Sequence, residues 1–255
     1  MNGMFDLTEK VALITGAGRG MGKAHAKALA AQGATVVITG RDLAECEAVR
    51  KEIGGSAASF ALDVSNAKEV DEVFTAVAEK FGRLDILVNN AGIYESKPAL
   101  LLTEAEWERT IRINLTGQFF CAQRAAKEMA KNKWGRIVNI TSIASGGVGI
   151  GFAGAAHYAA SKGGIIGMTE TLAAEWAPLG ITVNAIGPGA IDTPMAREPG
   201  KPLSKELETE IEARVPMKRI GRPEEISAAV VFLASEEASY VTGATLYADG
   251  GWLAA

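Results

Sequence analysis

Near its N-terminus the chain reads Val11-Ala-Leu-Ile-Thr15-Gly-Ala-Gly-Arg-Gly-Met-Gly22, a short apolar run followed by a turn with four glycines. The apolar run predicts a buried strand, and the residues from Met21 to Ala31 predict the helix after it. Glycines in such a turn let the backbone approach an anion closely, and the helix N-terminus faces that anion with free N–H groups. The spacing Gly16-x-x-x-Gly20-x-Gly22 differs from the commoner Gly-x-Gly-x-x-Gly. Its position between strand and helix still favours a site for the phosphates of a dinucleotide.

The rest of the chain alternates short apolar runs with longer amphipathic ones. Continuous apolar character is typical of strands that are buried on both faces, as in a parallel sheet. Strands that alternate with helices of this length predict a single-domain α/β fold over residues 1–255. We expect a doubly wound parallel sheet of Rossmann type, with about seven strands and with helices on both faces. The further strands are expected at Ala34–Thr39, Ala58–Leu62, Leu84–Val88, Arg136–Ile140, Ile181–Ile186 and Ala244–Tyr247.

Two longer segments interrupt this alternation. Thr103-Glu-Ala-Glu106 has the sequence of a capping box, so one helix is expected to run from it toward Lys131. The segment from Thr193 to Arg219 is polar, contains proline and lies between the sixth strand and the last helix. In a doubly wound sheet it would lie at the carboxyl ends of the strands, where ligands bind. We therefore interpret residues 193–219 as a substrate lid, with a solvated excursion as the alternative.

Composition and charge narrow the class of protein. The 255 residues are 48% hydrophobic and 22% charged, as in a soluble globular domain. The net charge of -4 and the pI near 5.4 argue against a nucleic-acid surface. Neither Cys46 and Cys121 nor any other cluster has the spacing of metal ligands, so no metal is expected. The chain has neither a signal peptide at Met1–Lys10 nor an apolar run long enough to cross a membrane. A cytoplasmic protein with reduced thiols is therefore expected.

The run Tyr158-Ala-Ala-Ser-Lys162 gives the clearest indication of chemistry. Residues four apart share one face of a helix, so the phenol and the ammonium should lie together. A phenol with a reference pKa of about 10 is a poor acid–base group at neutral pH. A neighbouring ammonium favours the phenolate and lowers that pKa toward the working range. Proton transfer by Tyr158 beside a dinucleotide site points to hydride-transfer chemistry.

Seven sequence motifs follow one another in the order of a known enzyme family. The chain resembles the short-chain dehydrogenase/reductase family over essentially its whole length. The resemblance implies an oxidoreductase that transfers hydride between a nicotinamide cofactor and a secondary alcohol or ketone. It rests on Thr15-Gly-x-x-x-Gly20-x-Gly22, Asp63-Val64, Asn89-Asn-Ala-Gly92, Asn114, Ser142, Tyr158-x-x-x-Lys162, and Pro188-Gly189 with Thr193.

The resemblance also implies a role for each matching residue. Tyr158 would be the general acid or base, and Lys162 would hold the nicotinamide ribose and lower the Tyr158 pKa. Ser142 would bind the substrate oxygen together with Tyr158, and Asn114 would position a water that links Lys162 to solvent. The cofactor phosphates would be bound by Gly16, Arg19, Gly20, Met21 and Gly22, the adenosine side by Arg41, Asp63, Val64, Asn90, Ala91 and Gly92, and the nicotinamide side by Tyr158, Lys162, Pro188, Gly189, Ile191 and Thr193.

One spacing departs from the family pattern. Ser142 and Tyr158 are 16 apart, which is longer than in many relatives, and spacing alone would favour Ser145 as the catalytic serine. Val138-Asn-Ile-Thr141 has the character of a strand end, and this favours Ser142. The extra residues lie in the glycine-rich stretch from Ser145 to Gly154, which we expect to line the substrate mouth with apolar groups.

The end of the second strand bears on the choice of cofactor. An acidic side chain there accepts the ribose 2′-hydroxyl of NAD, whereas an arginine accommodates the 2′-phosphate of NADP. Gly40 stands at the acidic position, Arg41 follows it, and Arg19 lies in the glycine turn. Two guanidiniums favour a phosphate, so NADP(H) is predicted. NAD(H) is the alternative if Asp42 reaches the ribose hydroxyl.

The sequence leaves the substrate and the partners open. One alternative substrate is a 3-oxoacyl thioester of acyl carrier protein or coenzyme A, with Lys131-Asn-Lys133 and Arg136 in contact with the anionic carrier. Leu179 stands where such reductases tend to have a basic residue, which counts against this substrate. The motifs are also compatible with an NAD-dependent sugar, polyol or hydroxysteroid dehydrogenase, and more remotely with a non-catalytic nucleotide-binding regulator. The resemblance also implies a homotetramer or dimer, with Trp252 at a second subunit interface.

Overall fold

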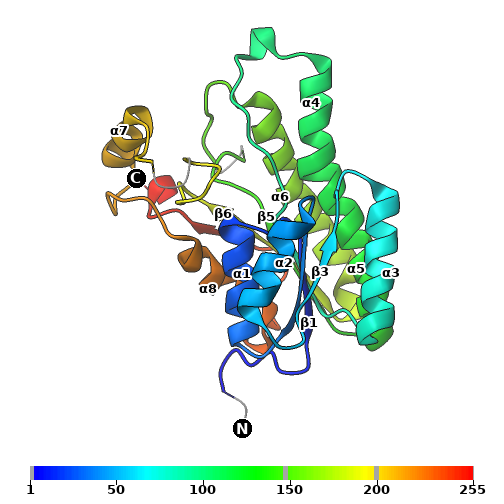
Figure 1. Cartoon of the computed structure of the whole chain (residues 1–255). Helices are drawn as coiled ribbons and strands as arrows, with labels where there is room; N and C mark the ends of the chain where they lie inside the picture. The colour runs from blue at the N-terminus through cyan, green and yellow to red at the C-terminus, as the bar shows by residue number, and fades with distance from the viewer. Residues whose placement is uncertain (1–2, 146–148, 198–200, 255) are drawn as a thin grey trace.

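Seven strands form one parallel sheet in residues 3–145, 149–197 and 201–254, the part of the chain that this computed structural model describes. The strand order is β3-β2-β1-β4-β5-β6-β7, so the direction of winding reverses between β1 and β4. Figure 1 shows the sheet with helices packed around it. Ligands of doubly wound folds bind at this reversal, outside the carboxyl ends of the strands. The strands are β1 Val11–Ile14, β2 Thr35–Gly40, β3 Ala58–Ala61, β4 Ile86–Asn89, β5 Gly135–Ile140, β6 Ile181–Pro188 and β7 Thr245–Ala248.

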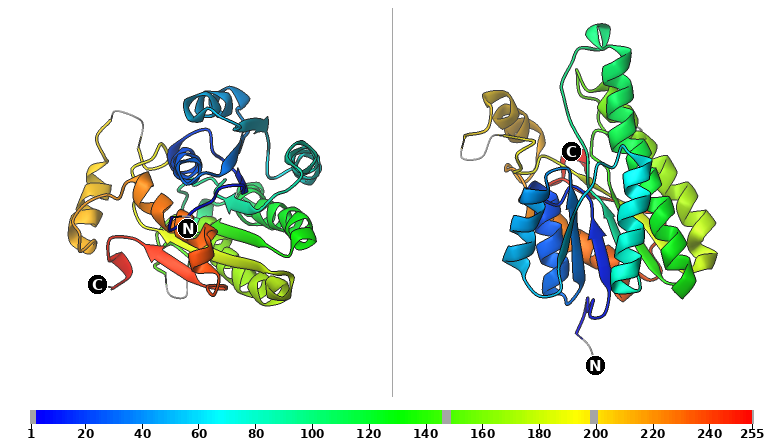
Figure 2. Two further views of the ribbon diagram at one scale, coloured as in Figure 1. Left: turned by 90° about the horizontal axis from the view of Figure 1, so that it is seen from below. Right: turned by 45° about the vertical axis from the view of Figure 1, so that its right-hand side comes forward.

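Helices cover both faces of this sheet. The helices α1, α2 and α8 lie on one face, and α3, α5 and α6 lie on the other (Figure 2). The predicted α/β class and doubly wound parallel sheet are therefore confirmed. The helices are α1 Gly20–Ala31, α2 Leu43–Ile53, α3 Ala67–Phe81, α4 Glu104–Ile111, α5 Gly117–Asn132, α6 Ala156–Trp176, α7 Lys205–Arg214 and α8 Pro223–Ala234.

Two apolar clusters fill the space between the sheet and its helices. Successive residues of β1 point to opposite faces. Ala12 and Ile14 pack with α1 and α8, whereas Val11 and Leu13 pack with α3, α5 and α6. All four side chains are buried, which is the physical reason for the continuous apolar run in the sequence.

Three properties of the described residues bear on the class of protein. None of their helices is both long and apolar enough to cross a lipid bilayer. Their His, Cys, Asp and Glu side chains form no group of three or more that could hold a metal ion. Cys46 and Cys121 are buried free thiols, and burial raises the pKa of the Cys121 thiol to about 12.

The helix that the sequence predicts from Thr103 toward Lys131 is interrupted. Its capping box forms as predicted: the Glu106 N–H donates to the Thr103 hydroxyl, and the Glu106 carboxylate accepts from the Thr103 N–H. After α4, however, residues Arg112–Thr116 form a π turn before α5 begins at Gly117. A π turn contains one extra residue and is frequently found at functional sites. This one carries Asn114.

The expected lid segment contains a helix, α7, that the sequence pattern did not predict. The Ser204 hydroxyl accepts the Leu207 N–H and caps α7 at its start. Ile211 of α7 packs with Ile143 and Trp252 in a third apolar cluster. Because Trp252 is buried in its own chain, the structure does not support its expected place at a second subunit interface. Residues 198–200 of the lid and 146–148 of the glycine-rich loop lie outside the described residues.

Candidate active site

The glycine turn after β1 is shaped by positive backbone angles and by close packing. Gly16 and Gly20 have φ of 63° and 56°, in the left-handed region that favours glycine. A Cβ on Gly22 would lie 2.3 Å from the Gly16 carbonyl oxygen, so a larger residue does not fit there. The helix α1 begins without a side-chain cap, which leaves N–H groups of its first turn able to bind an anion. The turn can therefore hold a pyrophosphate.

Thr15 and Asn90 join the glycine turn to the segment after β4. The Thr15 hydroxyl accepts the N–H groups of Asn90 and Ala91, each at 3.0 Å. The Asn90 side-chain amide donates to the carbonyl oxygens of Thr15, at 3.0 Å, and Gly16, at 3.1 Å. The two predicted cofactor motifs thus form one hydrogen-bonded unit. Thr15 is a part of this unit whose role was not predicted from the sequence.

The two residues that compete for the ribose have different surroundings at the end of β2. Asp42 caps α2, because its carboxylate accepts the N–H groups of Ala44, at 2.9 Å, and Glu45, at 3.2 Å. Arg41 is exposed and makes no hydrogen bond or ion pair within the described chain. Arg19 Nη1 lies 3.7 Å from Glu45 Oε1. Arg41 is therefore the side chain that is free to bind an added phosphate.

Asp63 and Val64 follow β3 at the same edge of the sheet. The Asp63 carboxylate accepts the N–H of Ser65, at 2.9 Å, and its hydroxyl, at 2.7 Å, which closes a tight turn. Val64 is buried, and a Cβ on Gly117 would lie 2.8 Å from its carbonyl oxygen. Both residues are thus fixed by contacts within the chain.

Tyr158 lies in the first turn of α6, and Ser142 follows β5. Burial raises the pKa of the Tyr158 phenol, a hydrogen bond with Ser142 opposes this, and the nearby Tyr94 adds to the increase. The Ser142 hydroxyl also accepts the Ala144 N–H at 3.1 Å, which leaves its own hydrogen for the Tyr158 oxygen. The phenol is therefore protonated at neutral pH and able to donate a proton.

Lys162 follows Tyr158 by one helical turn and is 4% exposed. Its Nζ donates to the Ile140 carbonyl oxygen at 2.8 Å and lies 5.6 Å from the centroid of the Tyr158 ring. Burial lowers the pKa of Lys162 from 10.5 to about 8. From the sequence, this ammonium was expected to lower the Tyr158 pKa. In this structure the net direction is upward, because burial of the phenol is the largest cause.

Asn114 is held in the π turn by the backbone of the segment after β4. Its Oδ1 accepts the Ile93 N–H at 2.8 Å, and its Nδ2 donates to the Ile93 carbonyl oxygen at 3.0 Å. Nδ2 also lies 3.2 Å from the Ser161 hydroxyl. A Cβ on Gly92 would lie 3.3 Å from Asn114 Oδ1 and 3.7 Å from Lys162 Nζ. The glycine thus marks the place where Asn114 and Lys162 approach each other.

The two candidate catalytic serines lie in different surroundings. Ser142 makes the hydrogen bond with Tyr158. Ser145 is buried, and its hydroxyl lies 3.4 Å from the Tyr247 hydroxyl on β7. Its backbone packs against α6, since a Cβ on Gly163 would lie 2.5 Å from the Ser145 carbonyl oxygen. The structure therefore brings Ser142, and not Ser145, to the phenol.

The segment after β6 reaches the glycine turn. Ile191 forms a parallel bridge with Gly221, which anchors the segment beside the start of α8. A Cβ on Gly20 would lie 3.5 Å from Pro194 Cδ and 3.7 Å from Thr193 Cβ. The lid segment therefore begins directly beside the candidate phosphate site.

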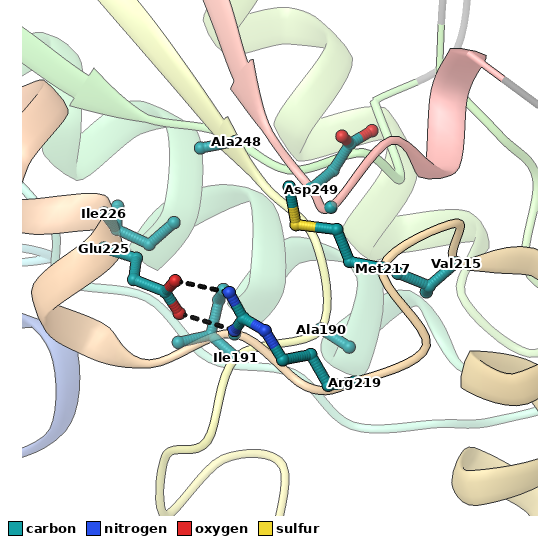
Figure 3. A pocket seen from close by; sticks show the side chains of 11 residues that line it. Ala190, Ile191, Val215, Met217, Arg219, Glu225, Ile226, Ala248 and Asp249 are labelled. Atoms are coloured by element: carbon teal, nitrogen blue, oxygen red, sulfur yellow. Dashed lines mark hydrogen bonds and ion pairs between the residues drawn. The ribbon is translucent and has the colours of Figure 1, made fainter.

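A small pocket of about 150 Å³ lies behind this segment, on the side of α8 (Figure 3). Ile191, Met217 and Ile226 are among its lining residues. Arg219, which also lines the pocket, makes two hydrogen bonds to the Glu225 carboxylate, at 2.8 and 2.6 Å. The predicted catalytic residues do not line it. We therefore do not assign this pocket as the substrate site.

The basic residues that were predicted to contact an anionic carrier do not lie beside the candidate catalytic residues. Arg136 is buried, packs 4.4 Å from the Trp134 ring centroid and donates to the Ser235 carbonyl oxygen at 3.2 Å. Lys131 pairs with Glu128. These residues lie near Gly135, where β5 begins, whereas Ser142 follows the other end of β5. The basic group therefore lies at the opposite edge of the sheet.

Tyr94 is a site residue that was not predicted from the sequence. Its ring lies edge-on to the Tyr158 ring, with 5.0 Å between centroids and 77° between planes. Tyr94 follows Gly92 by two residues, and the only sequence signal was this place just after a predicted cofactor motif.

The doubly wound sheet, the uncapped start of α1 and the buried Tyr–Lys pair together define a nicotinamide-dependent oxidoreductase. The family profile described as "Enoyl-(Acyl carrier protein) reductase" matches residues 16–253. The 3-oxoacyl-(acyl-carrier-protein) reductase FabG of Vibrio cholerae is 42% identical over 246 residues, which cover 96% of this chain and 98% of that protein.

Solved structures give the same result. A putative gluconate dehydrogenase from Agrobacterium tumefaciens superposes with a TM-score of 0.93 at 40% identity, over 99% of both chains. A putative short-chain alcohol dehydrogenase from Sinorhizobium meliloti gives 0.92 at 41% identity, over 99% of this chain and 100% of that one. The chain therefore belongs to the short-chain dehydrogenase/reductase family, and it is an NAD(P)-dependent oxidoreductase that acts on CH–OH and C=O groups.

Proposed function

We propose that this enzyme reduces a ketone to a secondary alcohol with NADPH, and that Tyr158 donates the proton. The observation that carries the proposal is the geometry of the Tyr158–Lys162 pair: the buried Lys162 Nζ lies 5.6 Å from the centroid of the Tyr158 ring. The Ser142 hydroxyl acts on the same phenol. A general acid must lie within hydrogen-bond reach of the oxygen that it protonates. A second hydroxyl beside it can stabilise the charge that develops on that oxygen. Ser142 and Tyr158 therefore bind the carbonyl oxygen, and the nicotinamide supplies the hydride when it is bound.

Lys162 and Asn114 act after Tyr158 has donated its proton: Lys162 stabilises the phenolate, and Asn114 helps to return a proton to it. The phenolate then forms beside the Lys162 ammonium, and an opposite charge at this range favours the ionised form. Lys162 also holds the nicotinamide ribose. Asn114, fixed by the Ile93 backbone next to Lys162, positions a water that returns a proton from solvent.

The residues of the glycine turn and the strand ends fit a dinucleotide. The pyrophosphate of the cofactor would bind at the start of α1, where no side chain caps the N–H groups. Asp63 and Val64 border the adenine, and Ile191 and Thr193 hold the carboxamide. In full, the proposed cofactor residues are Gly16, Arg19, Gly20, Met21, Gly22, Arg41, Asp63, Val64, Asn90, Ala91, Gly92, Tyr158, Lys162, Pro188, Gly189, Ile191 and Thr193.

Arg41 is proposed to select NADPH over NADH. Its guanidinium is exposed and has no partner in the described chain, and a charge-assisted bond to the 2′-phosphate is worth about 1.5–3 kcal/mol. Arg41→Ala should therefore raise the Kd for NADPH about 10- to 100-fold, while the Kd for NADH changes little. Tryptophan quenching in parallel titrations measures both constants.

The matched control is Lys51→Ala, which removes a cation from the last turn of α2. It should leave both dissociation constants nearly unchanged. Equal losses for NADPH and NADH in Arg41→Ala would contradict the assignment, and would return the ribose contact to Asp42 or to the backbone.

A second candidate function is the reduction of a 3-oxoacyl thioester. It is supported by the relatives named as 3-oxoacyl-(acyl-carrier-protein) reductases, which include one from Vibrio cholerae at 42% and one from Synechocystis at 44% identity. The chemistry at Tyr158 is the same, because the group reduced is a ketone in both cases. The distant place of Lys131 and Arg136 gives no support for a carrier at the predicted basic contact.

Consumption of NADPH tests both candidates in one assay. The purified enzyme is mixed with NADPH and with 2-butanone, acetophenone or acetoacetyl-coenzyme A. A much higher kcat/KM for the thioester would favour the second candidate, and turnover of the simple ketones favours the first. Binding of NADPH without turnover of any carbonyl compound would contradict the proposed function.

We also propose a homo-oligomer. Leu100, Leu101 and Trp107 are exposed apolar side chains on α4 and the turn before it, with 100%, 64% and 38% of their surface accessible. Grouped exposed apolar side chains are typical of surfaces that a partner covers.

A further inference from the structure

The segment from Ile93 to Lys97, which follows the Asn90-Ala-Gly92 motif, carries an aromatic ring beside the proton donor. Tyr94 is 40% exposed, and its ring meets the Tyr158 ring edge to face, at 5.0 Å between centroids. Its hydroxyl makes no hydrogen bond within the described residues. An exposed ring at this distance from the reacting phenol is within contact range of a group attached to the substrate carbonyl.

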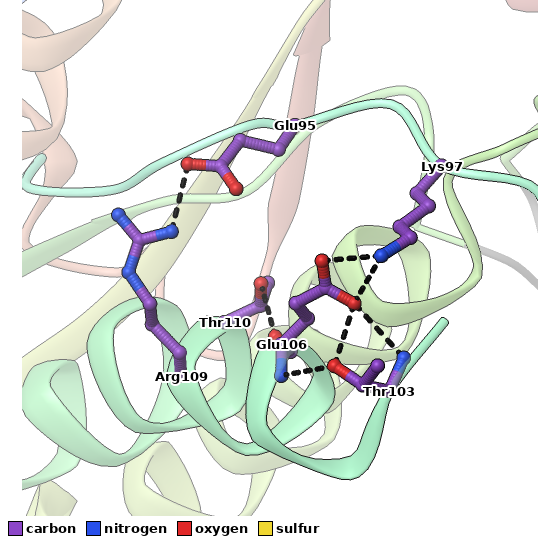
Figure 4. A network of polar contacts seen from close by, with 6 residues as sticks. All are labelled: Glu95, Lys97, Thr103, Glu106, Arg109 and Thr110. Carbon is purple, nitrogen blue, oxygen red and sulfur yellow. Dashed lines mark hydrogen bonds and ion pairs between the residues drawn. The ribbon is translucent and has the colours of Figure 1, made fainter. Parts of the chain in front are cut away.

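Ion pairs to α4 hold the part of this segment that follows Tyr94 (Figure 4). Glu95 accepts from Arg109 at 2.7 Å. Lys97 donates to the Glu106 carboxylate at 2.7 Å, and the same carboxylate accepts from the Thr103 hydroxyl at 2.6 Å. Each exposed pair alone stabilises the fold little. Together they orient the segment, and they pair the charges of Glu95 and Lys97 with opposite charges on α4.

The backbone that precedes Tyr94 is also fixed. Ile93, the residue before Tyr94, exchanges two hydrogen bonds with the Asn114 side chain, at 2.8 and 3.0 Å. The backbone on both sides of Tyr94 is therefore anchored, and the edge-to-face contact with Tyr158 orients the ring. Such preorganisation reduces the entropy cost of binding a ligand.

The same segment is joined to the glycine-rich loop that precedes α6. The Lys97 N–H donates to the Gly154 carbonyl oxygen at 2.8 Å. Gly154 has φ of 76°, and a Cβ there would lie 2.6 Å from Ser96 Oγ. The described part of that loop carries Ile150 and Phe152, which pack in the third apolar cluster. The segment that carries Tyr94 is therefore tied to a loop whose described apolar side chains are packed.

We propose that Tyr94 is a substrate-binding residue that selects ketones with a flat aromatic substituent on the carbonyl. The inference rests on the proposed ketone reduction and names the class of ketone. The Tyr94 ring supplies a fixed apolar surface beside Tyr158, and the ion pairs of Glu95 and Lys97 leave that surface uncharged. An aryl group on the carbonyl carbon packs on this ring, whereas a short alkyl group leaves most of it uncovered.

The test compares acetophenone with 2-butanone. Calorimetry measures the binding of each ketone to the enzyme saturated with NADP+, and steady-state assays with NADPH measure KM and kcat. We expect acetophenone to bind roughly tenfold more tightly than 2-butanone. Tyr94→Ala should remove this difference by weakening acetophenone alone, and Tyr94→Phe should keep it. Tyr240→Ala is the matched control, since that tyrosine is fully exposed, at 102%, and lies outside the site.

The Kd for NADPH and the thermal unfolding midpoint of each variant report whether the fold and the cofactor site are intact. Equal affinity of the wild-type enzyme for the two ketones would overturn the inference, as would equal weakening of both ketones in Tyr94→Ala. A tenfold binding preference that depends on Tyr94, found without turnover of either ketone, would support the role of Tyr94 and reject the proposed reduction. The two proposals can therefore fail separately.

Discussion

Tyr158→Phe is expected to lower kcat for ketone reduction about 10³-fold, while the Kd for NADPH stays close to that of the wild-type enzyme. General acid catalysis contributes about 10²- to 10⁴-fold, and phenylalanine keeps the ring but removes the proton. The edge-to-face contact with Tyr94 is retained, so the local packing should persist. Stopped-flow or steady-state NADPH oxidation gives kcat, and tryptophan quenching gives the dissociation constant.

The control for this variant is Tyr247→Phe, which removes a phenol hydroxyl that lies 3.4 Å from the Ser145 hydroxyl. Because the Ser145 hydroxyl contacts Tyr247 and makes no hydrogen bond with Tyr158 within the described residues, this change should reduce kcat by less than about threefold. Retention of more than about a tenth of the wild-type turnover in Tyr158→Phe would show that another group donates the proton. A large loss in Tyr247→Phe would instead move the catalytic serine to Ser145.

The fold could be predicted because its signals are local. β1 is a continuous apolar run because both of its faces are covered by helices, and the glycine turn stands between it and α1. The boundaries were less accurate, and β4 begins at Ile86 and not at Leu84. Asp85 explains this shift: its N–H donates to the Val11 carbonyl oxygen, and its carboxylate accepts the Val11 N–H at 2.8 Å. A buried polar residue at a strand entry has no signal in an apolar pattern.

The π turn at Arg112–Thr116 could not be predicted from periodicity. One extra residue in one turn changes the apolar spacing of a long helix very little. The turn is instead specified by contacts between distant segments, in which Asn114 bonds to the Ile93 backbone. Tyr94 was missed for the same reason. Its neighbour Tyr158 is far away in sequence, and only the folded chain brings the two rings together.

The competing serines and the competing ribose contacts show what three-dimensional contacts add. Spacing alone favoured Ser145, whereas the preceding strand end favoured Ser142, which was the residue predicted. The hydrogen bond of Ser142 with Tyr158 separates them. At the end of β2, Asp42 is occupied as the cap of α2 and Arg41 is free. Both distinctions depend on the groups that each side chain contacts in the folded chain, and the residue type alone does not give those contacts.

Lys162→Met is expected to abolish most of the turnover and also to stabilise the fold at pH 7. Burial lowers the pKa of Lys162 in the folded protein to about 8, from 10.5, so between these values the unfolded chain binds more protons than the folded one. Stability therefore rises with pH from about 8 to 10.5, and below about 8 the full cost of burying the ammonium is present. That cost is about 3 kcal/mol at 1.36 kcal/mol per pKa unit.

Methionine fills similar volume without a charge, although it loses the hydrogen bond to the Ile140 carbonyl oxygen, which is worth about 1 kcal/mol. The net gain for Lys162→Met should be about 1–2 kcal/mol at pH 7. It should fall toward zero or reverse at pH 10.5, where the wild-type lysine is largely neutral in the folded state and half neutral in the unfolded one. Urea unfolding at fixed protein concentration measures the difference at each pH. The exposed Lys127→Met on α5 is the control and should show no such pH dependence.

The second part of the prediction for Lys162→Met concerns turnover. Loss of Lys162 removes the cation beside the phenolate and the proposed contact to the ribose, so kcat/KM should fall about 10²- to 10³-fold. A variant that is more stable at neutral pH but nearly inactive would show that the buried ammonium is retained for chemistry at a cost in stability. A variant that is less stable at every pH would contradict the predicted cost of burying the ammonium. Retention of more than about a tenth of the wild-type kcat/KM would contradict the place of Lys162 in the proton path.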